Sequence, residues 1–286
     1  MRSNFKYFRP NSLQDAMDFL SDHAEESKIL SGGTDLLISA RNGVLESKYL
    51  VDVSRLEELR QVSVDQTRLT IGSALTFSEI VRNSTIQKFA PALIRASGQV
   101  GSLQIRNAGT LGGNVANASP AADSVPALMI HDAHVILISS GFEYSEPLSS
   151  FVTGAYRTNL KPGSIIKAFS LEIFPRGFRC AYNRIARRRS LSISRAGAAA
   201  MGFLDTDGII TDLRLSLSSI SPQPARMTVV EKYLIGRAPR SQLIFEAAQT
   251  VADEMVRISG ERPSFVYKKP AVVGLTIKTL EEMFLD

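Results

Sequence analysis

The chain has 286 residues, a formal net charge of +5, 44% hydrophobic side chains and 21% charged ones. These proportions are those of an ordinary globular protein and exclude a disordered chain, and the length predicts about two or three compact units. No run of about 18 apolar residues occurs, which excludes a membrane span, and the polar N-terminus is unlike a signal peptide. The single cysteine, Cys180, excludes internal disulfide bonds and an iron–sulfur cluster ligated by this chain alone. We therefore expect a cytoplasmic protein with no membrane partner.

The positive charge is uneven along the chain. One short segment holds a cluster of arginines, namely Arg184, Arg187, Arg188, Arg189 and Arg195. Such a cluster is as consistent with a solvated face as with a surface for an acidic subunit or an anionic ligand. We expect no nucleic-acid partner, because neither interleaved aromatic residues nor a helix-turn-helix pattern accompanies the arginines.

The N-terminal segment is expected to form a small unit in which strands and helices alternate. Its predicted elements are a strand at 5–8, a helix at 13–20 capped by Ser12, a strand at 28–31, a short helix at 35–40 and a strand at 49–53. The last three resemble a βαβ unit with glycines in its first turn. The unit is not a Rossmann fold, because the sequence G-x-G-x-x-G is absent, and no G-K-[ST] of a P-loop is present.

The middle of the chain mixes strands and helices. The expected elements are strands at 60–64 and 68–71, helices at 77–82 (capped by Thr76), 86–100 and 124–131, and strands at 133–139 and 165–173. A boundary is expected near residues 175–177. Beyond it, a β-hairpin at 196–204 and 209–218 precedes helices at 226–234, 242–258 and 270–284. These patterns predict an α+β protein, with one domain at 1–175 (subdomains at about 1–55 and 56–175) and a second at 176–286.

Two stretches with small side chains are candidates for a binding site. The first is Leu30-Ser31-Gly32-Gly33-Thr34-Asp35, and the second is RNAGTLGGNVANASPAADSVP at residues 106–126. Glycine lets backbone N–H groups approach a ligand closely and adopts positive φ at no steric cost. Either stretch alone is consistent with an ordinary tight turn. Together they suggest a cradle for an anion such as a pyrophosphate.

Catalytic groups are scarce in this sequence. The three histidines, His23, His131 and His134, are not in a metal-ligand spacing, and no G-x-S-x-G motif occurs. Cys180 is expected in a strand as an inert apolar residue. A chain with so few acids, bases and nucleophiles in recognisable patterns is expected to use the chemistry of a cofactor.

A dinucleotide fits the two glycine-containing stretches. Backbone N–H groups of residues 31–35 and 110–114 would bind its pyrophosphate from two sides, and Thr34, Thr110 and Asn114 would add side-chain donors. Asp123 would accept a hydrogen bond from a ribose or ribityl hydroxyl, or orient a neighbouring amide.

These same residues carry a family resemblance. LSGGTDLL at 30–37 and RNAGTLGGNVANASPAAD at 106–123 resemble the two flavin-binding motifs of the FAD-binding, or medium, subunit of the molybdenum hydroxylase (xanthine dehydrogenase) family. Lesser similarities occur at the N-terminus (F-x-Y-x-R-P-x-S-L-x-D-A), at 52–59 and at 70–76. The resemblance extends from residue 5 to about residue 235.

The resemblance implies a fold, a cofactor and a set of site residues. The fold would be a two-subdomain FAD-binding domain of the vanillyl-alcohol-oxidase (PCMH) type, followed by a small C-terminal α+β domain with an antiparallel sheet. FAD would lie extended between the domains. The implied FAD-binding residues are Lys28, Ile29, Leu30, Ser31, Gly32, Gly33, Thr34, Asp35, Val100, Thr110, Leu111, Gly112, Gly113, Asn114, Asp123, Ile165 and Arg184.

The resemblance also implies an electron relay. A large partner subunit with a molybdenum cofactor would oxidise an organic substrate, and a small subunit with two iron–sulfur clusters would pass the electrons to FAD. FAD would deliver them to NAD+, oxygen or another acceptor. Arg184 stands where many relatives carry a lysine close to the flavin, and we expect its charge to stabilise the reduced, anionic flavin.

The sequence departs from the family pattern after Arg184. Ser192-Ile193-Ser194 replaces an Asp-Ile-Ala motif, and Arg187-Arg188-Arg189 is unusual, so this loop is expected to be looser or to serve a different acceptor. Two other functions remain open. One is a scaffold of the same fold without flavin, which the intact glycines disfavour. The other is a free-standing flavin oxidase or reductase, which the lack of an evident substrate acid or base disfavours.

Overall fold

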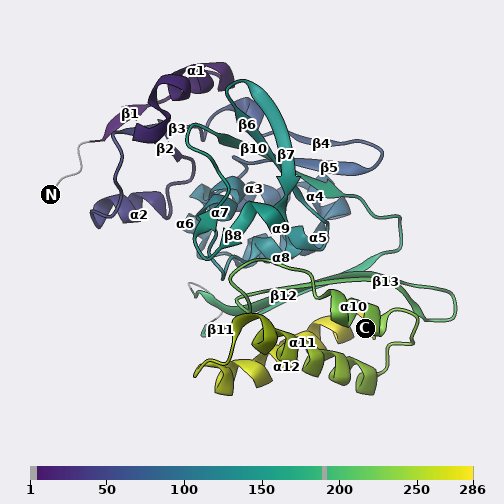
Figure 1. Cartoon of the computed structure of the whole chain (residues 1–286). Helices are drawn as coiled ribbons and strands as arrows, with labels where there is room; N and C mark the ends of the chain where they lie inside the picture. The colour runs from purple at the N-terminus through teal and green to yellow at the C-terminus, as the bar shows by residue number, and fades with distance from the viewer. Residues whose placement is uncertain (1–4, 189–191, 286) are drawn as a thin grey trace.

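Three units follow one another along the chain in the computed structural model, which describes residues 5–188 and 192–285. Figure 1 shows the N-terminal unit at the upper left, the second sheet beside it with its helices below, and the C-terminal sheet with its helices at the bottom. Residues 173–178 link the second unit to the third, at the place where the sequence predicts a boundary. The division into domains at 175 remains a prediction.

The first unit is a three-stranded parallel sheet with two helices. Its strands β1 (Lys6–Phe8), β2 (Ser27–Leu30) and β3 (Tyr49–Asp52) have the order β1-β3-β2, with 3-10 turns at Ala24–Glu26 and Glu57–Leu59. Helix α1 (Leu13–His23) begins at Ser12, whose side chain accepts from the Asp15 N–H as a helix cap should. Helix α2 (Leu36–Arg41) connects β2 to β3, which confirms the predicted βαβ arrangement.

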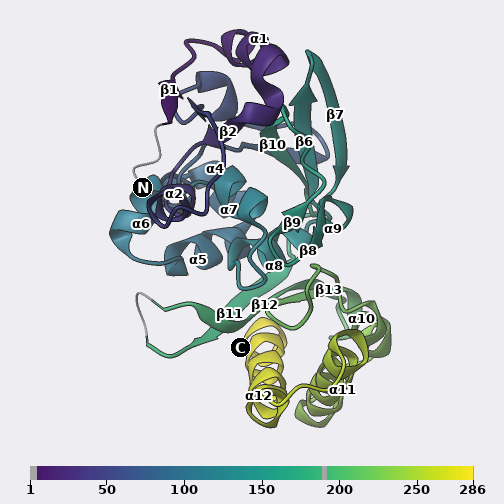
Figure 2. The same cartoon turned by 60° about the vertical axis from the view of Figure 1, so that its left-hand side comes forward.

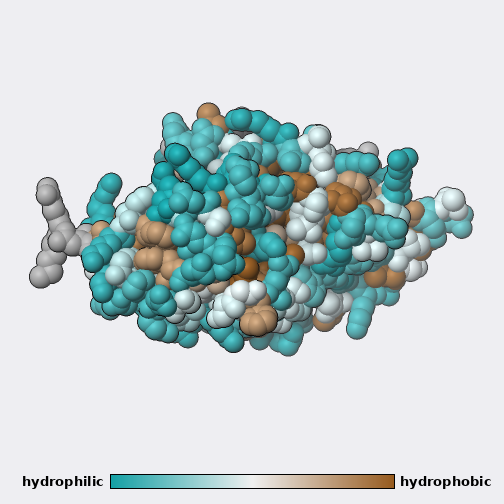
Figure 3. All heavy atoms as spheres, turned by 90° about the horizontal axis from the view of Figure 1, so that it is seen from above, coloured by the Kyte–Doolittle hydropathy of each residue, from teal (hydrophilic) through white to brown (hydrophobic). Residues whose placement is uncertain are grey.

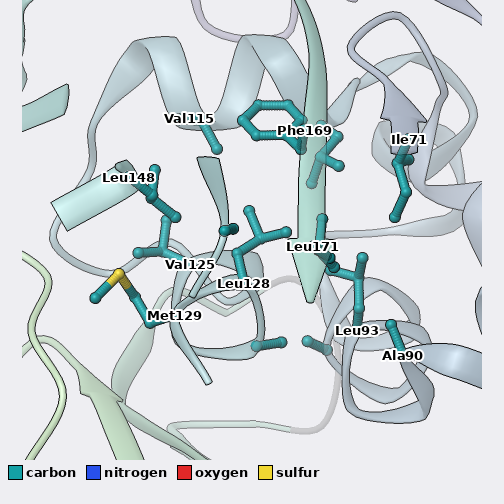
Figure 4. Close-up of a cluster of buried hydrophobic side chains, with 14 of the residues drawn as sticks. Ile71, Ala90, Leu93, Val115, Val125, Leu128, Met129, Leu148, Phe169 and Leu171 are labelled. Atoms are coloured by element: carbon teal, nitrogen blue, oxygen red, sulfur yellow. The ribbon is translucent and has the colours of Figure 1, made fainter. Parts of the chain in front are cut away.

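The second unit contains a five-stranded antiparallel sheet of order β4-β5-β10-β6-β7. Its strands are β4 (Val62–Val64), β5 (Arg68–Gly72), β6 (His134–Ser139), β7 (Phe142–Pro147) and β10 (Ile165–Glu172), and a two-stranded ladder is formed by β8 (Val152–Gly154) and β9 (Arg157–Thr158). Short helices cover one face (Figure 2), namely α3 (Phe77–Arg82), α4 (Ser84–Phe89), α5 (Pro91–Gln99), α6 (Leu103–Ala108), α7 (Leu111–Asn117), α8 (Ser124–Met129) and α9 (Leu148–Phe151). Phe169 and Leu171 of β10 pack with Leu93 and Leu128 of these helices in the core (Figure 4).

Two expectations for this unit are wrong. The single helix expected at 86–100 is divided into α4 and α5, because Pro91 has no N–H and stands at the first position of a new helix. The stretch 106–126 is expected to be a loop whose backbone is accessible because its side chains are small. Instead, Leu111–Asn117 is helical and buries Leu111, Gly112 and Val115. Gly112 allows close packing against the end of the neighbouring strand, at Ser73, whereas Gly113 is exposed.

The third unit is an antiparallel sheet of β11 (Arg179–Ala186), β12 (Ser194–Leu204) and β13 (Ile210–Ser218), followed by α10 (Thr228–Leu234), α11 (Ser241–Ser259) and α12 (Phe265–Phe284). The β12–β13 hairpin is confirmed, with the Asp205 carboxylate accepting from the N–H groups of Asp207 and Ile209. Helix α12 begins earlier than expected and contains Pro270 in its first turns.

Small residues let the β12 strand be covered on both faces. Ala199 and Met201 belong to the core shared with the second unit, whereas Ala198 and Ala200 belong to the core shared with the C-terminal helices. Alternate side chains of a strand point to opposite faces, so a run of alanines lets helices from two units approach one sheet. The second and third units are therefore joined by a continuous packed interface.

Viewed from above the first unit, the molecular surface is mostly hydrophilic, with hydrophobic side chains in separate small areas (Figure 3). Within residues 5–188 and 192–285, no helix is long and apolar enough to cross a membrane.

Candidate cofactor-binding cleft

Two adjoining cavities run between the units. The first, of about 510 Å³, lies beside the glycine-containing turn of the first unit, and the second, of about 700 Å³, lies between the second and third units. They share a group of lining residues, namely Asp35, Val100, Ile105, Asn114 and Asn117. The cavities therefore form one elongated cleft that contacts all three units.

The turn after β2 presents free backbone donors to this cleft. The N–H groups of Gly32, Gly33, Thr34 and Asp35 donate to no other group of the described chain. Gly33 has φ +69°, a left-handed conformation that favours glycine. A Cβ on Gly32 would lie 2.1 Å from the Ala108 carbonyl oxygen, so only glycine fits there. The turn thus packs against the second motif while its own amides stay available to an anion.

The second motif contributes differently from what its sequence suggests. The N–H groups of residues 111–114 already donate within the protein, those of Leu111 and Gly112 to the carbonyls of Leu75 and Ser73, and the other two to Thr110. The expectation of free backbone donors at 110–114 is therefore wrong for residues 111–114, because these residues form helix α7. What α7 offers the cleft is side-chain groups: the Asn114 Oδ1 accepts from Ser124, which directs Asn114 within the shared wall of both cavities.

The structure brings the two motifs together. The Thr110 hydroxyl donates to the Ser31 hydroxyl at 3.0 Å, and the Asn117 amide donates to the Asp35 carboxylate at 3.2 Å. Gly33 and Gly112, far apart in sequence, line the same cavity. The two side-chain-poor segments thus adjoin and line one cleft together.

Some of the other residues implied by the family resemblance line the cleft, and others do not. Lys28, Ile29 and Ile165 line the first cavity, Val100 lines both, and Asp123 lines the second. Leu30 and Leu111 are buried in the core and line neither cavity. Arg184 is also absent from both walls. Arg189, in the arginine cluster, lies outside the described residues.

Asp123 is the centre of a buried network. Its Oδ1 accepts from the Tyr182 hydroxyl at 2.7 Å and the Ser194 hydroxyl at 2.5 Å, and its Oδ2 accepts from Arg184 Nη1 at 2.9 Å. Burial raises the pKa of the Asp123 carboxyl, and the hydroxyl donors and the Arg184 guanidinium oppose that rise. Burial and the neighbouring carboxylate raise the pKa of Tyr182 well above its ordinary value, so the phenol remains a donor.

This network changes the interpretation of Arg184. Its side chain is only 5% exposed and forms a buried ion pair with Asp123, so its charge is compensated and is held behind the cavity wall. Arg184 is therefore a support for Asp123 and not a free cation facing the cleft.

Several residues of the cleft were missed by sequence reasoning. Tyr182 could have been found, because it stands two residues before Arg184 on one strand and so shares its face. Ser194 appears in the sequence only as a departure from the family motif, although it is a partner of Asp123. Lys268 and Arg262, which line the second cavity, have no local signal in the sequence.

Neither a metal-binding cluster nor an ionised thiol is evident among the described residues. No group of three or more His, Cys, Asp and Glu side chains within them could hold a metal ion. Burial raises the pKa of the Cys180 thiol to about 11, so it remains protonated near neutral pH, in accord with an inert residue.

Comparison with known families identifies the architecture. Residues 3–171 match the family described as the FAD binding domain in molybdopterin dehydrogenase, and residues 181–283 match the CO dehydrogenase flavoprotein C-terminal domain. The chain belongs to this family. It is thus a FAD-binding subunit of an oxidoreductase, and the family resemblance found in its two motifs is confirmed.

Relatives of this FAD-binding subunit match it over nearly its whole length. The xanthine dehydrogenase FAD-binding subunit of Escherichia coli O157:H7 is 31% identical over 278 residues, covering 96% of this chain and 94% of the relative. The nicotinate dehydrogenase FAD-subunit of Eubacterium barkeri is 30% identical over 288 residues, covering 99% and 96%.

Solved structures show the same fold. A cyanide-inactivated Cu,Mo-CO dehydrogenase chain superposes with a TM-score of 0.92 at 22% identity, covering 100% of this chain and 99% of that one. A chain of the carbon monoxide dehydrogenase from Hydrogenophaga pseudoflava gives a TM-score of 0.90 at 24% identity, with the same coverage. The predicted α+β fold of the FAD-binding subunit is confirmed.

Proposed function

We propose that this FAD-binding subunit relays electrons from the iron–sulfur clusters of a small partner subunit to NAD+ or another acceptor. A large partner subunit with a molybdenum cofactor would carry the site at which the organic substrate is oxidised. The observation that carries the proposal is the set of four unpaired amides at Gly32–Asp35, which faces a cleft long enough for a dinucleotide.

The residues of the first cavity fit a diphosphate. The free N–H groups of Gly32–Asp35 would donate to its oxygens, as backbone concavities do at other phosphate sites. The Thr34 hydroxyl and the Asn114 amide would add donors from the two walls. Lys28, Ile29 and Ile165 extend the first cavity toward the N-terminal unit and would hold the adenosine end.

The residues of the second cavity fit the flavin end. Bound FAD supplies the redox chemistry, since its ring can exchange electrons one or two at a time. Among residues 5–188 and 192–285, Asp123 Oδ2 accepts from one donor, Arg184, and it would accept from a ribityl hydroxyl as well. Tyr182 and Ser194 would keep the carboxylate in one orientation, and Val100 would exclude water from the apolar part of the wall.

The lining of the cleft favours a relay over substrate oxidation by this chain alone. No histidine or cysteine is among the described residues that line either cavity. Several relatives are named as a medium chain or a FAD subunit, which is the basis for proposing partner subunits here. A scaffold without flavin is disfavoured. Such a protein would not require free backbone amides beside Gly32, a position where the Ala108 carbonyl leaves no room for a Cβ.

The substitution Gly113→Val tests the cradle. Gly113 is exposed to the first cavity, and a Cβ there would meet only the Thr110 hydroxyl, at 3.0 Å, so the fold should persist while the side chain fills the cavity. The purified wild-type chain should show a flavin absorption spectrum, and the variant should lose at least about nine-tenths of its FAD. Gly274→Val is the matched control, because Gly274 lies on the exposed face of α12 with nothing within 4 Å of its Cβ position.

Full FAD content in the Gly113→Val protein would contradict this binding mode, and a colourless wild-type protein would favour the scaffold instead. The relay is tested by affinity purification of the tagged wild-type chain from its own cells. Recovery of molybdenum and iron in the complex supports it, whereas a lone flavoprotein that oxidises a substrate unaided would favour a free-standing oxidase or reductase.

A further inference from the structure

The second cavity is lined by two cations that have no carboxylate partner among the described residues. Four charged side chains line it, Asp35, Asp123, Arg262 and Lys268. Asp123 is paired with Arg184, and Asp35 accepts from the neutral Asn117 amide. Neither Lys268 nor Arg262 forms an ion pair within residues 5–188 and 192–285. The cations of this wall therefore lack the carboxylate partners that surface cations usually have.

Lys268 is the more enclosed of the two. It stands in the first turns of α12, it is half-buried, and its Nζ donates to the Ser219 carbonyl oxygen, another group of the cavity wall. Ser219 is itself fixed, since its N–H donates to the Pro120 carbonyl at 2.7 Å and its backbone has φ +65°. A carbonyl orients the ammonium group but carries no compensating charge.

The surroundings of Lys268 do not favour its charge. Burial lowers the pKa of its ammonium group, and the positive charge of Arg262 lowers it further. An anion in the cavity would remove this cost. Arg262 is exposed and donates from Nε to the Ser259 carbonyl, so solvent screens it more than Lys268.

Resting on the proposed function, we propose that Lys268 is the cation that stabilises the reduced, anionic form of FAD. Two-electron reduction of an isoalloxazine places negative charge on the ring, and an unpaired cation in the same partly enclosed cavity attracts that charge more strongly than water does. Sequence reasoning gave this role to Arg184. The ion pair of Arg184 with Asp123 leaves the role to Lys268.

The test is the two-electron midpoint potential of bound FAD, measured by equilibrium reduction in the presence of a reference dye. Lys268→Met should weaken the binding of reduced FAD relative to oxidised FAD about tenfold, which corresponds to a potential lower by about 30 mV. Lys268→Arg keeps the charge and should restore most of the wild-type potential. Lys269→Met is the matched control, because Lys269 lines neither cavity and pairs with Glu261.

An unchanged potential in a Lys268→Met protein with full FAD content would overturn the proposal. So would an equal shift in the Lys269→Met control, because it would indicate a general loss of surface charge. The proposed function fails by a different observation, namely a wild-type chain that binds no FAD.

Discussion

His131 is a buried titratable residue at the junction of α8 and β6. It is 1% exposed, its Nδ1 lies 2.9 Å from the Glu172 carbonyl oxygen, and its ring contacts Phe174 edge-on. Burial lowers the pKa of His131 from 6.5 to about 4, partly opposed by the bond to Glu172. The folded protein therefore holds this imidazole neutral over a range in which the unfolded chain protonates it.

The pH dependence of stability follows from this shift. Because the folded-state pKa is the lower one, the contribution of His131 is fully present above pH 6.5 and is lost as the pH falls from 6.5 to about 4. Between pH 7 and pH 5 the free energy of unfolding should fall by about 2 kcal/mol from this residue. Urea unfolding of wild type and His131→Asn at both pH values checks it, since the variant should lack that part of the slope. Identical slopes would contradict the assignment.

At the scale of elements, helix α7 is defined by how closely it packs on the end of β5. A Cβ at Gly112 would lie 2.7 Å from Ser73 Cβ and 2.9 Å from Ser73 O, and the Gly112 N–H donates to that same carbonyl. The helix, its Thr110 cap and the cleft wall thus depend on the absence of a side chain at one position.

Gly112→Ala should destabilise the protein by about 1–3 kcal/mol, because the added methyl group overpacks a rigid backbone contact. Gly274→Ala is a matched control in the exposed middle of α12, where it should stabilise by about 0.5–1 kcal/mol. Denaturant titrations compare the two variants with wild type. A Gly112→Ala protein as stable as wild type would show that α7 shifts freely on its neighbour.

The sequence predicts the elements whose signals are local. Thr76 and Glu79 form the full capping box at the start of α3, and the turn at Asp205 closes the β12–β13 hairpin as its residues demand. The helical state of residues 111–117 could not be predicted from composition, because two adjacent glycines are unfavourable in an isolated helix and only packing on Ser73 compensates.

Contacts between residues that are distant in sequence could not be predicted either, because they leave no local signal. Tyr182 and Ser194 stand 59 and 71 residues from Asp123. The spacing of Tyr182 to Arg184 indicates a shared strand face, but no local pattern predicts that Tyr182 or Ser194 donates to the Asp123 carboxylate. The glycine cradle was recognisable, because its composition and its family motifs coincide. The sequence does not show which charged side chains pair with each other. The role expected for Arg184 is therefore wrong, because Arg184 forms an ion pair with Asp123.

At the scale of the whole molecule, an ion-pair network joins the second and third units. Asp132 accepts from Arg214 at 2.7 Å and from Arg226 at 2.8 Å, and Arg214 also binds Glu172 at 2.8 Å. Arg226 continues the network to Glu231, whose carboxylate is buried. Because Asp132 and Glu172 belong to the second unit and the arginines to the third, the network couples the unfolding of the two.

Asp132→Asn should therefore lower stability by about 1 kcal/mol, a small value because Asp132 is 44% exposed and solvent screens its charge. Asparagine tolerates the positive φ of this position, so the backbone should be unchanged. Asp253→Asn, on the exposed face of α11, is the control and should be neutral. Differential scanning calorimetry at low and high salt checks the prediction, and the difference between the two variants should shrink in high salt.

The β11–β12 hairpin has a mechanical consequence. Tyr182, Arg184 and Ser194 lie in its two strands, the latter two close to the connecting turn, and all three donate to the Asp123 carboxylate of the second unit. Because donors from both strands bind one carboxylate, a displacement of this end of the hairpin would move Asp123 and with it a wall of the second cavity.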